Sequence, residues 1–183
     1  FGFMTAVHYM TNAFDGPIYL LLLITCYFLL WKFSKHFFIS SGLTVAFFTL
    51  FSMPFNLFFK PFASGIGVNC APSFFVKLQK FGPFFFEKGN CQVSPFWMMF
   101  LLWGFFWISL IILLVFLKRQ NISRIDGFIL TLLTFSTALV FIPEFLYIKD
   151  IYPAHFRANT MFKLGYQAFI MGAVASSFVF FKI

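Results

Sequence analysis

The chain has 183 residues, of which 61% are hydrophobic and only 10% charged, with a formal net charge of +8. A soluble domain usually carries about 25% charged residues, so this composition excludes an ordinary soluble domain and predicts a polytopic membrane protein. The basic residues gather at the ends of apolar segments, where they set membrane orientation, so we expect membrane lipids and no nucleic acid as partners.

The first apolar segment begins the chain at Phe1, without a preceding Met. This start favours the C-terminal part of a longer protein, with residues 1–10 as the end of a truncated span. The first whole span is predicted over residues 17–31. Pro17 suits the first helical position, and Asp15 is expected to cap the helix just ahead of it.

The second whole span is predicted over residues 37–59, with a kink at Pro54 near its end. A long loop, residues 60–94, follows. Its aromatic clusters are too hydrophobic for a free solvated loop, so we expect it to lie on the membrane surface or to fold back over the helices. Glycines and prolines disfavour a continuous helix there: Gly65, Gly67, Pro72, Gly82, Pro83 and Gly89. Its lysines are expected to meet lipid headgroups or an anionic ligand: Lys77, Lys80 and Lys88.

Three cysteines are present. Cys26 lies inside a predicted span and is expected to be inert. Cys70 and Cys91 share the long loop and can pair where that loop faces an oxidising compartment, and the sequence leaves this open. Neither has a neighbouring set of residues with metal-ligand spacing, so no metal site is predicted.

Three more spans are predicted, over residues 95–117, 127–142 and 161–181. Ser94 and Pro95 open the first of them as helix cap and first-turn proline. Asp126 is expected to cap the second, and Pro143 to stop it. The sequence thus predicts an all-α fold, a polytopic transmembrane helical bundle of about five full spans plus a partial N-terminal one. The bundle is expected to form a single membrane domain over residues 1–183.

The five whole spans divide the connections between the two sides of the membrane. One side has short connections rich in cations, so the positive-inside rule predicts that it is cytoplasmic. It holds residues 32–36, 118–126 and Lys182. The other side is predicted to be non-cytoplasmic, at the cell membrane, and holds residues 11–16, 60–94 and 144–160. Because segments with chemical content meet on that side, we expect the functional site there.

The densest chemistry lies in residues 144–163. Its second half is typical of a helix entrance, where Asn159 or the next residue caps the helix and Lys163 falls in the first turn. Arg157 lies just upstream. Two cations beside the positive end of a helix are expected to hold an anion between them. The sequence leaves that anion open between a phosphate ligand and two acids, Glu144 and Asp150.

Two motifs stand out, one near each end of the chain. The C-terminal motif comprises Pro143, Glu144, Tyr147, Lys149, Asp150, the run 157–163, Tyr166 and Gln167. The N-terminal motif comprises Asn12, Asp15, Pro17 and Tyr19. Both resemble the YYY membrane protein family of large bacterial and archaeal multi-pass proteins, with Phe14 where the family has Trp and Ala158 where Met is common. The resemblance covers essentially the whole chain.

By architecture that family is similar to the GT-C class of membrane glycosyltransferases, which use lipid-phosphate-linked sugars. The resemblance thus implies transfer of a sugar from a polyprenyl-phosphate donor outside the cytoplasm, and it names no cofactor. Such a transfer needs a base for the acceptor and cations for the departing phosphate. Candidate bases are Asp15, Glu144 and Asp150. Candidate phosphate-binding residues are Arg157 and Lys163, and supporting residues are Asn12, His155, Asn159, Tyr166 and Gln167.

Several of these candidates have a structural alternative. Asp15 is suited to a helix cap, and His155 to an interfacial position. Arg157 and Lys163 are equally suited to an ion pair with an acid of the segment. The alternative function is a non-enzymatic transporter, or a lipid-handling or scaffold protein. The span interiors hold only scattered Ser and Thr, which argues against an ion-coupled transporter.

Overall fold

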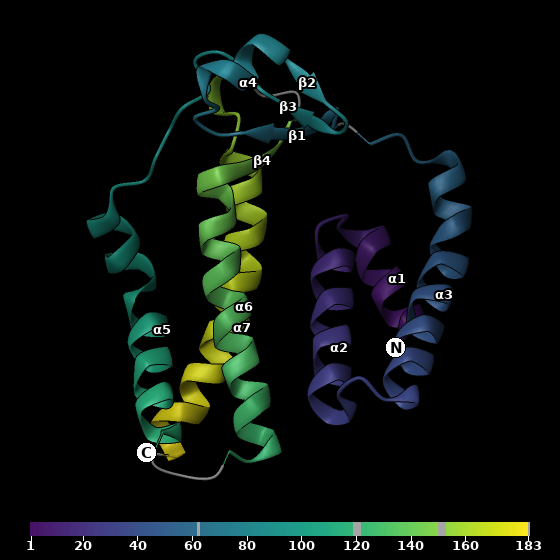
Figure 1. The fold of residues 1–183 in the computed structure, drawn as a ribbon, viewed down its shortest axis with the longest axis vertical. Helices are drawn as coiled ribbons and strands as arrows, with labels where there is room; N and C mark the ends of the chain where they lie inside the picture. The colour runs from purple at the N-terminus through teal and green to yellow at the C-terminus, as the bar shows by residue number, and fades with distance from the viewer. Residues whose placement is uncertain (62, 119–121, 150–152, 183) are drawn as a thin grey trace. The chain divides into compact units, whose positions relative to one another are not determined.

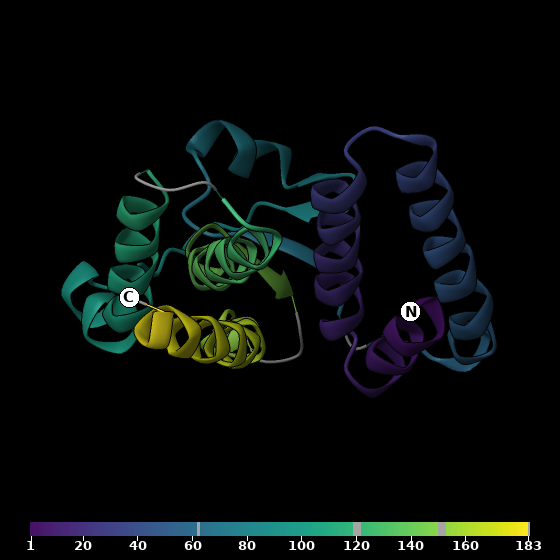
Figure 2. The same ribbon diagram turned by 90° about the horizontal axis from the view of Figure 1, so that it is seen from below.

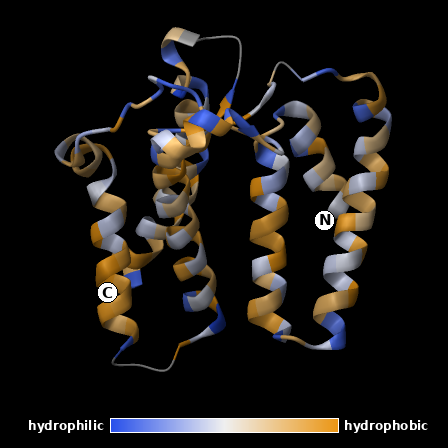
Figure 3. Cartoon of the chain, turned by 45° about the horizontal axis from the view of Figure 1, so that its top comes forward, coloured by the Kyte–Doolittle hydropathy of each residue, from blue (hydrophilic) through white to orange (hydrophobic). Residues whose placement is uncertain are grey.

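The computed structural model describes residues 1–61, 63–118, 122–149 and 153–182. The described chain is mostly helical, with seven α-helices and a small sheet. Figure 1 draws these elements as a ribbon. It divides into two compact units, one of residues 1–60 and 114–132, the other of residues 61–113 and 133–183. Figure 3 shows that the long helices are largely hydrophobic and that hydrophilic residues gather at their ends and in the connections.

The first unit contains α1 (Gly2–Thr11), α2 (Asp15–Trp31) and α3 (Lys35–Phe58). Small residues let these helices approach closely. A Cβ added to Gly2 would stand 2.5 Å from the carbonyl oxygen of Thr44, and one added to Gly16 would clash with Tyr9. The hydroxyls of Tyr27 and Thr44 share a hydrogen bond of 3.2 Å between α2 and α3.

The second unit contains most of α5 (Phe96–Leu117), α6 (Arg124–Phe145) and α7 (Ala158–Lys182), with a short 3-10 helix, Pro153–His155. Helices α6 and α7 lie side by side (Figure 2). The hydroxyl of Ser136 donates to the carbonyl of Ala168 at 2.7 Å, which joins the two helices inside the unit. Gly172 faces both Ser136 and Phe106 of α5, so the absence of a side chain at this position lets three helices meet.

A four-stranded sheet completes the second unit, in the order β2-β3-β1-β4. Its strands are β1 (Gly65–Val68), β2 (Lys80–Phe81), β3 (Phe84–Phe85) and β4 (Leu146–Lys149), and α4 (Ser73–Leu78) lies between β1 and β2. Strand β4 directly follows α6 and pairs antiparallel with β1, so the sheet stands at the end of α6 (Figure 1). We call residues 63–92 and 146–149 the sheet lobe.

Two glycines of β1 make room for aromatic rings on one face of this sheet. A Cβ on Gly65 would clash with the ring of Phe85, and a Cβ on Gly67 would clash with the ring of Tyr147. Residues two apart on a strand share a face, and Gly67 pairs with both Phe85 and Tyr147. The glycine alternation of β1 is therefore a packing requirement of the lobe.

The predicted spans are present as helices, but the count of about five full spans is not confirmed. By length and composition, four helices of the described chain are able to cross a membrane: α3, α5, α6 and α7. The remaining candidate, α2, has only 17 residues and is a shorter apolar helix. The all-α prediction also missed the sheet, whose two- and four-residue strands pair across the long loop and β4.

Several predicted helix ends need correction. Pro143 does not end α6: it lies inside the helix, which runs on for two more residues to Phe145. Helix α2 begins at Asp15, two residues ahead of Pro17. Asp15 therefore lies in its first turn, and Phe14 occupies the N-cap position without a side-chain cap. Helix α3 starts as a capped helix, with Ser34 accepting from the N–H of Phe37.

The later helix starts also differ from prediction. Helix α6 begins at Arg124, ahead of Asp126, and a reciprocal capping box joins Asp126 to Ser123. Helix α7 begins at Ala158, so Asn159 lies inside it and Lys163 falls in its second turn, beyond the strongest part of the helix dipole.

Candidate functional site

The centre of the candidate site is an ion pair between Glu144 and Arg157. Glu144 lies in the last turn of α6, and Arg157 immediately precedes α7. The Oε2 atom of Glu144 lies 2.8 Å from Nη1 of Arg157, and their side chains are only 8% and 7% exposed. Of the anions that the sequence left open for Arg157, the structure places Glu144 against it.

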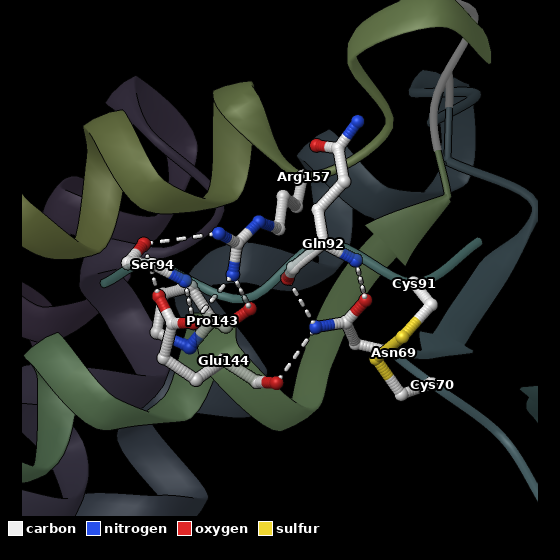
Figure 4. The surroundings of a disulfide bond; sticks show 8 residues. All are labelled: Asn69, Cys70, Cys91, Gln92, Ser94, Pro143, Glu144 and Arg157. Atoms are coloured by element: carbon white, nitrogen blue, oxygen red, sulfur yellow. Dashed lines mark hydrogen bonds and ion pairs between the residues drawn. A yellow bond between two sulfur atoms is a disulfide. The ribbon is translucent and has the colours of Figure 1, made fainter. Parts of the chain in front are cut away.

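Ser94 completes the hydrogen bonding of this pair (Figure 4). Its backbone N–H donates to Oε2 of Glu144 at 2.8 Å, and its hydroxyl donates to Oε1 at 2.7 Å. The same hydroxyl accepts from Nη2 of Arg157 at 3.0 Å, and Nη1 also donates to the carbonyl of Pro143 at 3.3 Å. One network therefore joins the segment before α5, the end of α6 and the start of α7. Ser94, predicted as a helix cap, donates to a carboxylate instead.

Asn69 ties the sheet lobe to this network. Its amide donates to the carbonyls of Gln92, at 2.7 Å, and of Glu144, at 2.8 Å, while its side-chain oxygen accepts from the N–H of Gln92 at 3.0 Å. The next residue, Cys70, forms a disulfide with Cys91. The pairing that the sequence left open is thus formed, beside the ion pair (Figure 4).

A second polar cluster lies on the lobe. The ammonium of Lys149 forms an ion pair with Oε1 of Glu87, and both side chains are about one-third exposed. Oε2 of Glu87 accepts from Asn90 at 2.9 Å and from the hydroxyl of Tyr147 at 3.3 Å. Burial raises the pKa of Tyr147; the hydrogen bond from Asn90 lowers it, and the negative charge of Glu87 adds to the rise. The Lys149 ammonium also lies 4.7 Å from the ring centroid of Phe85.

The remaining predicted site residues are distributed over α7, the segment ahead of it and the first unit. On α7, Gln167 is buried, Asn159 and Lys163 are half-buried, and Tyr166 is exposed, as is His155 ahead of the helix. Asp150 lies outside the described residues. Asn12 and Asp15 belong to the first unit, where the Asn12 amide donates to the Asp15 carboxylate at 2.7 Å.

Several residues of the clusters were missed as site residues, among them Asn69, Ser94 and Glu87. Each forms a hydrogen bond with a residue at least 50 positions away in the sequence, so no local spacing indicates it. In the part of the chain that the structure describes, no group of three or more His, Cys, Asp or Glu side chains is arranged to hold a metal ion.

Comparison with known proteins gives one family. Residues 91–171 match the family model described as Uncharacterized membrane protein (DUF2298). The matched stretch runs from Cys91 through the first half of α7, so it contains Ser94, Glu144 and Arg157. No curated protein and no solved structure matches the chain. Together with the four long apolar helices of the described chain, this match indicates a membrane protein with a multi-pass architecture.

Proposed function

We propose that this chain belongs to a membrane glycosyltransferase that takes a sugar from a polyprenyl-phosphate donor and acts outside the cytoplasm. The observation that carries the proposal is the buried Glu144–Arg157 pair at the end of α6, a potential span. A lipid-linked phosphate stands at this level, between hydrocarbon and water. Planar guanidinium groups bind phosphate in two-pronged geometry, which supports Arg157 as its partner.

In the proposed reaction the donor phosphate takes the place of the Glu144 carboxylate on Arg157. The released carboxylate accepts the proton of an acceptor hydroxyl, whose oxygen attacks the anomeric carbon of the sugar. The bond from that carbon to the phosphate oxygen breaks, and the phosphate leaves with the electron pair. Arg157, with Lys163 on the next helix, offsets its negative charge.

Glu144 is a better candidate for the base than Asp15, because the two acids have different partners. Asp15 bonds to Asn12 in the first turn of α2, an arrangement suited to starting a helix. Glu144 instead contacts the cation that would bind the donor. Exchange of one anion for another then couples donor binding to activation of the base.

Two independent arguments support a non-cytoplasmic location for the site. Cation-rich connections on the opposite side favour it by the positive-inside rule. The Cys70–Cys91 disulfide lies beside the pair, and disulfides persist in oxidising compartments.

The alternative, a non-enzymatic lipid-handling, transporter or scaffold protein, is favoured by one observation. Every oxygen of the Glu144 carboxylate already has a donor within the chain: Oε1 from Ser94 and Oε2 from Ser94 and Arg157. A network so complete is suited to holding helix ends together.

Binding of a polyprenyl phosphate to the full-length protein in detergent distinguishes the two. We expect saturable binding that Arg157→Lys weakens, since a lysine keeps the charge but loses the planar fork, and that adding Lys163→Gln abolishes. Lys149→Gln is the matched control, because its cation pairs with Glu87 on the lobe, and it should bind as the wild type does. Binding indifferent to both Arg157 and Lys163, or absent from the wild type, would favour the scaffold alternative.

A further inference from the structure

The segment from Cys91 to Pro95, which we call the strap, links the sheet lobe to α5 and passes beside the Glu144–Arg157 pair (Figure 4). It has no regular secondary structure, and all its side chains except that of Ser94 are exposed. Val93, its largest apolar side chain, is 67% exposed. The strap therefore buries almost no apolar surface that would keep it closed.

Three anchors hold the strap in place. At its start, Cys91 is bonded to Cys70. One residue on, Gln92 exchanges two hydrogen bonds with the side chain of Asn69. Two residues further, Ser94 donates twice to the carboxylate of Glu144. The disulfide is the only covalent anchor of the three, and the two polar anchors lie directly downstream of it.

We propose that the Cys70–Cys91 disulfide is a redox latch that keeps the Glu144–Arg157 pair closed. A dithiol reductant breaks the S–S bond, leaves two cysteine thiols and is itself oxidised to a disulfide. The strap then opens, Ser94 withdraws both donors from Glu144, and the guanidinium of Arg157 meets water. This latch does not depend on the transferase proposal, because it concerns access to the pair and not what the pair binds.

The accessibility of Arg157 measures the latch directly. Phenylglyoxal modifies exposed arginines, and peptide mapping reports each site separately. Arg157 is 6% exposed, whereas Arg124 is exposed and serves as the reference within the same molecule. The experiment uses the full-length protein in detergent, with Cys26→Ser so that no other cysteine of this chain exchanges with the pair.

We expect slow labelling of Arg157 in the oxidised protein and labelling about tenfold faster or more after reduction, since the disulfide closes a long loop. The rate at Arg124 should not change, and reoxidation should restore the protection of Arg157. Cys70→Ser/Cys91→Ser should behave as the reduced protein does. Val93→Ala, which alters an exposed strap side chain, should leave the oxidised rate unchanged.

Two results would overturn the latch. One is an Arg157 that stays protected after the disulfide is shown to be reduced, which would mean that the polar anchors alone close the strap. The other is labelling that rises on reduction but does not fall on reoxidation, which would mean that the protein has unfolded. A binding assay for polyprenyl phosphate separates this outcome from the proposed function, because failure of either leaves the other testable.

Discussion

The carboxylate of Glu144 lies 2.8 Å from the guanidinium of Arg157, at the point where α6 ends and α7 begins. Both side chains are more than nine-tenths buried. Ser94 donates to both carboxylate oxygens of Glu144 and accepts from Nη2 of Arg157. Charges lose their hydration when buried, and only a complete set of partners offsets that loss. The pair is consequently far more sensitive to loss of one member than an exposed pair is.

Loss of one member of this pair should destabilise the protein strongly. We expect Arg157→Met to lower the free energy of unfolding by about 3–5 kcal/mol, because it leaves the Glu144 carboxylate buried without its cation. The double variant Glu144→Gln/Arg157→Met should lose less than the sum of the two single changes, since no unpaired charge remains. Denaturant titration of the protein in detergent measures these differences.

Glu87→Gln is the matched control for that experiment. It breaks the Glu87–Lys149 pair, whose side chains are about one-third exposed, so the expected loss is about 1 kcal/mol or less. If Glu87→Gln lowered the free energy of unfolding as much as Arg157→Met does, the Glu144–Arg157 pair would not be the more sensitive of the two pairs.

The apolar helices were predictable because hydropathy alone defines them. Predicted spans over 37–59 and 161–181 correspond to α3 (Lys35–Phe58) and α7 (Ala158–Lys182) within three residues at each end. A bilayer demands runs of this length and composition from any helix that crosses it, so the signal is strong. The status of α2 was less secure, since 17 residues lie at the lower limit of a span.

The sheet was not predictable, because its signal is neither local nor long. Strands β2 and β3 have two residues each, and β1 pairs with β4 across 78 to 84 positions, from Val68↔Leu146 to Gly65↔Lys149. The glycines of β1 indicated a loop by composition, whereas their role is to admit the rings of Phe85 and Tyr147. Pairing of this kind depends on tertiary contacts that no window of the sequence contains.

The two charged residues of the central pair stood out in the sequence, but their partners did not. Arg157 and Glu144 stood out as charges at span ends. The sequence had no means to choose between Glu144, Asp150 and a ligand as the anion for Arg157. Ser94 was predicted as a helix cap because a serine before a proline is typical of one, and its carboxylate partner lies 50 residues away.

Gly67→Ala should destabilise the sheet lobe. The new methyl group would clash with the ring of Tyr147, which is 1% exposed and has little room to move. Overpacking of this kind is expected to lower the free energy of unfolding by about 1–3 kcal/mol. Gly127→Ala is the control, since nothing lies within 4 Å of a Cβ there and alanine favours helix. Equal stability of the two variants in thermal unfolding would contradict the packing of Tyr147 on β1.

Gly172→Ala should loosen the packing of α7. A Cβ at this position would stand 2.8 Å from both the Phe106 ring and the Ser136 hydroxyl, so neighbouring helices must shift. Gly165→Ala is the matched change on the same helix, where the nearest atom, in Trp103, lies 3.5 Å away in ordinary contact. We expect Gly172→Ala alone to lower the unfolding midpoint. A loss in Gly165→Ala as large as that in Gly172→Ala would contradict this explanation, because alanine favours helix at both positions and only Gly172 has a close contact.

Tyr147 should make the stability of the lobe fall at alkaline pH. Its hydroxyl is buried and lies 3.3 Å from the Glu87 carboxylate, and both conditions raise the pKa of the folded state above the ordinary value of 10.0. Between these two pKa values the folded protein holds a proton that the unfolded chain has lost, so the free energy of unfolding declines as pH rises. Below a pH of about 10 both states are protonated and the contribution is fully present. Unfolding titrations of wild type and Tyr147→Phe across this range should converge as pH rises, whereas a constant gap between them would contradict the raised pKa.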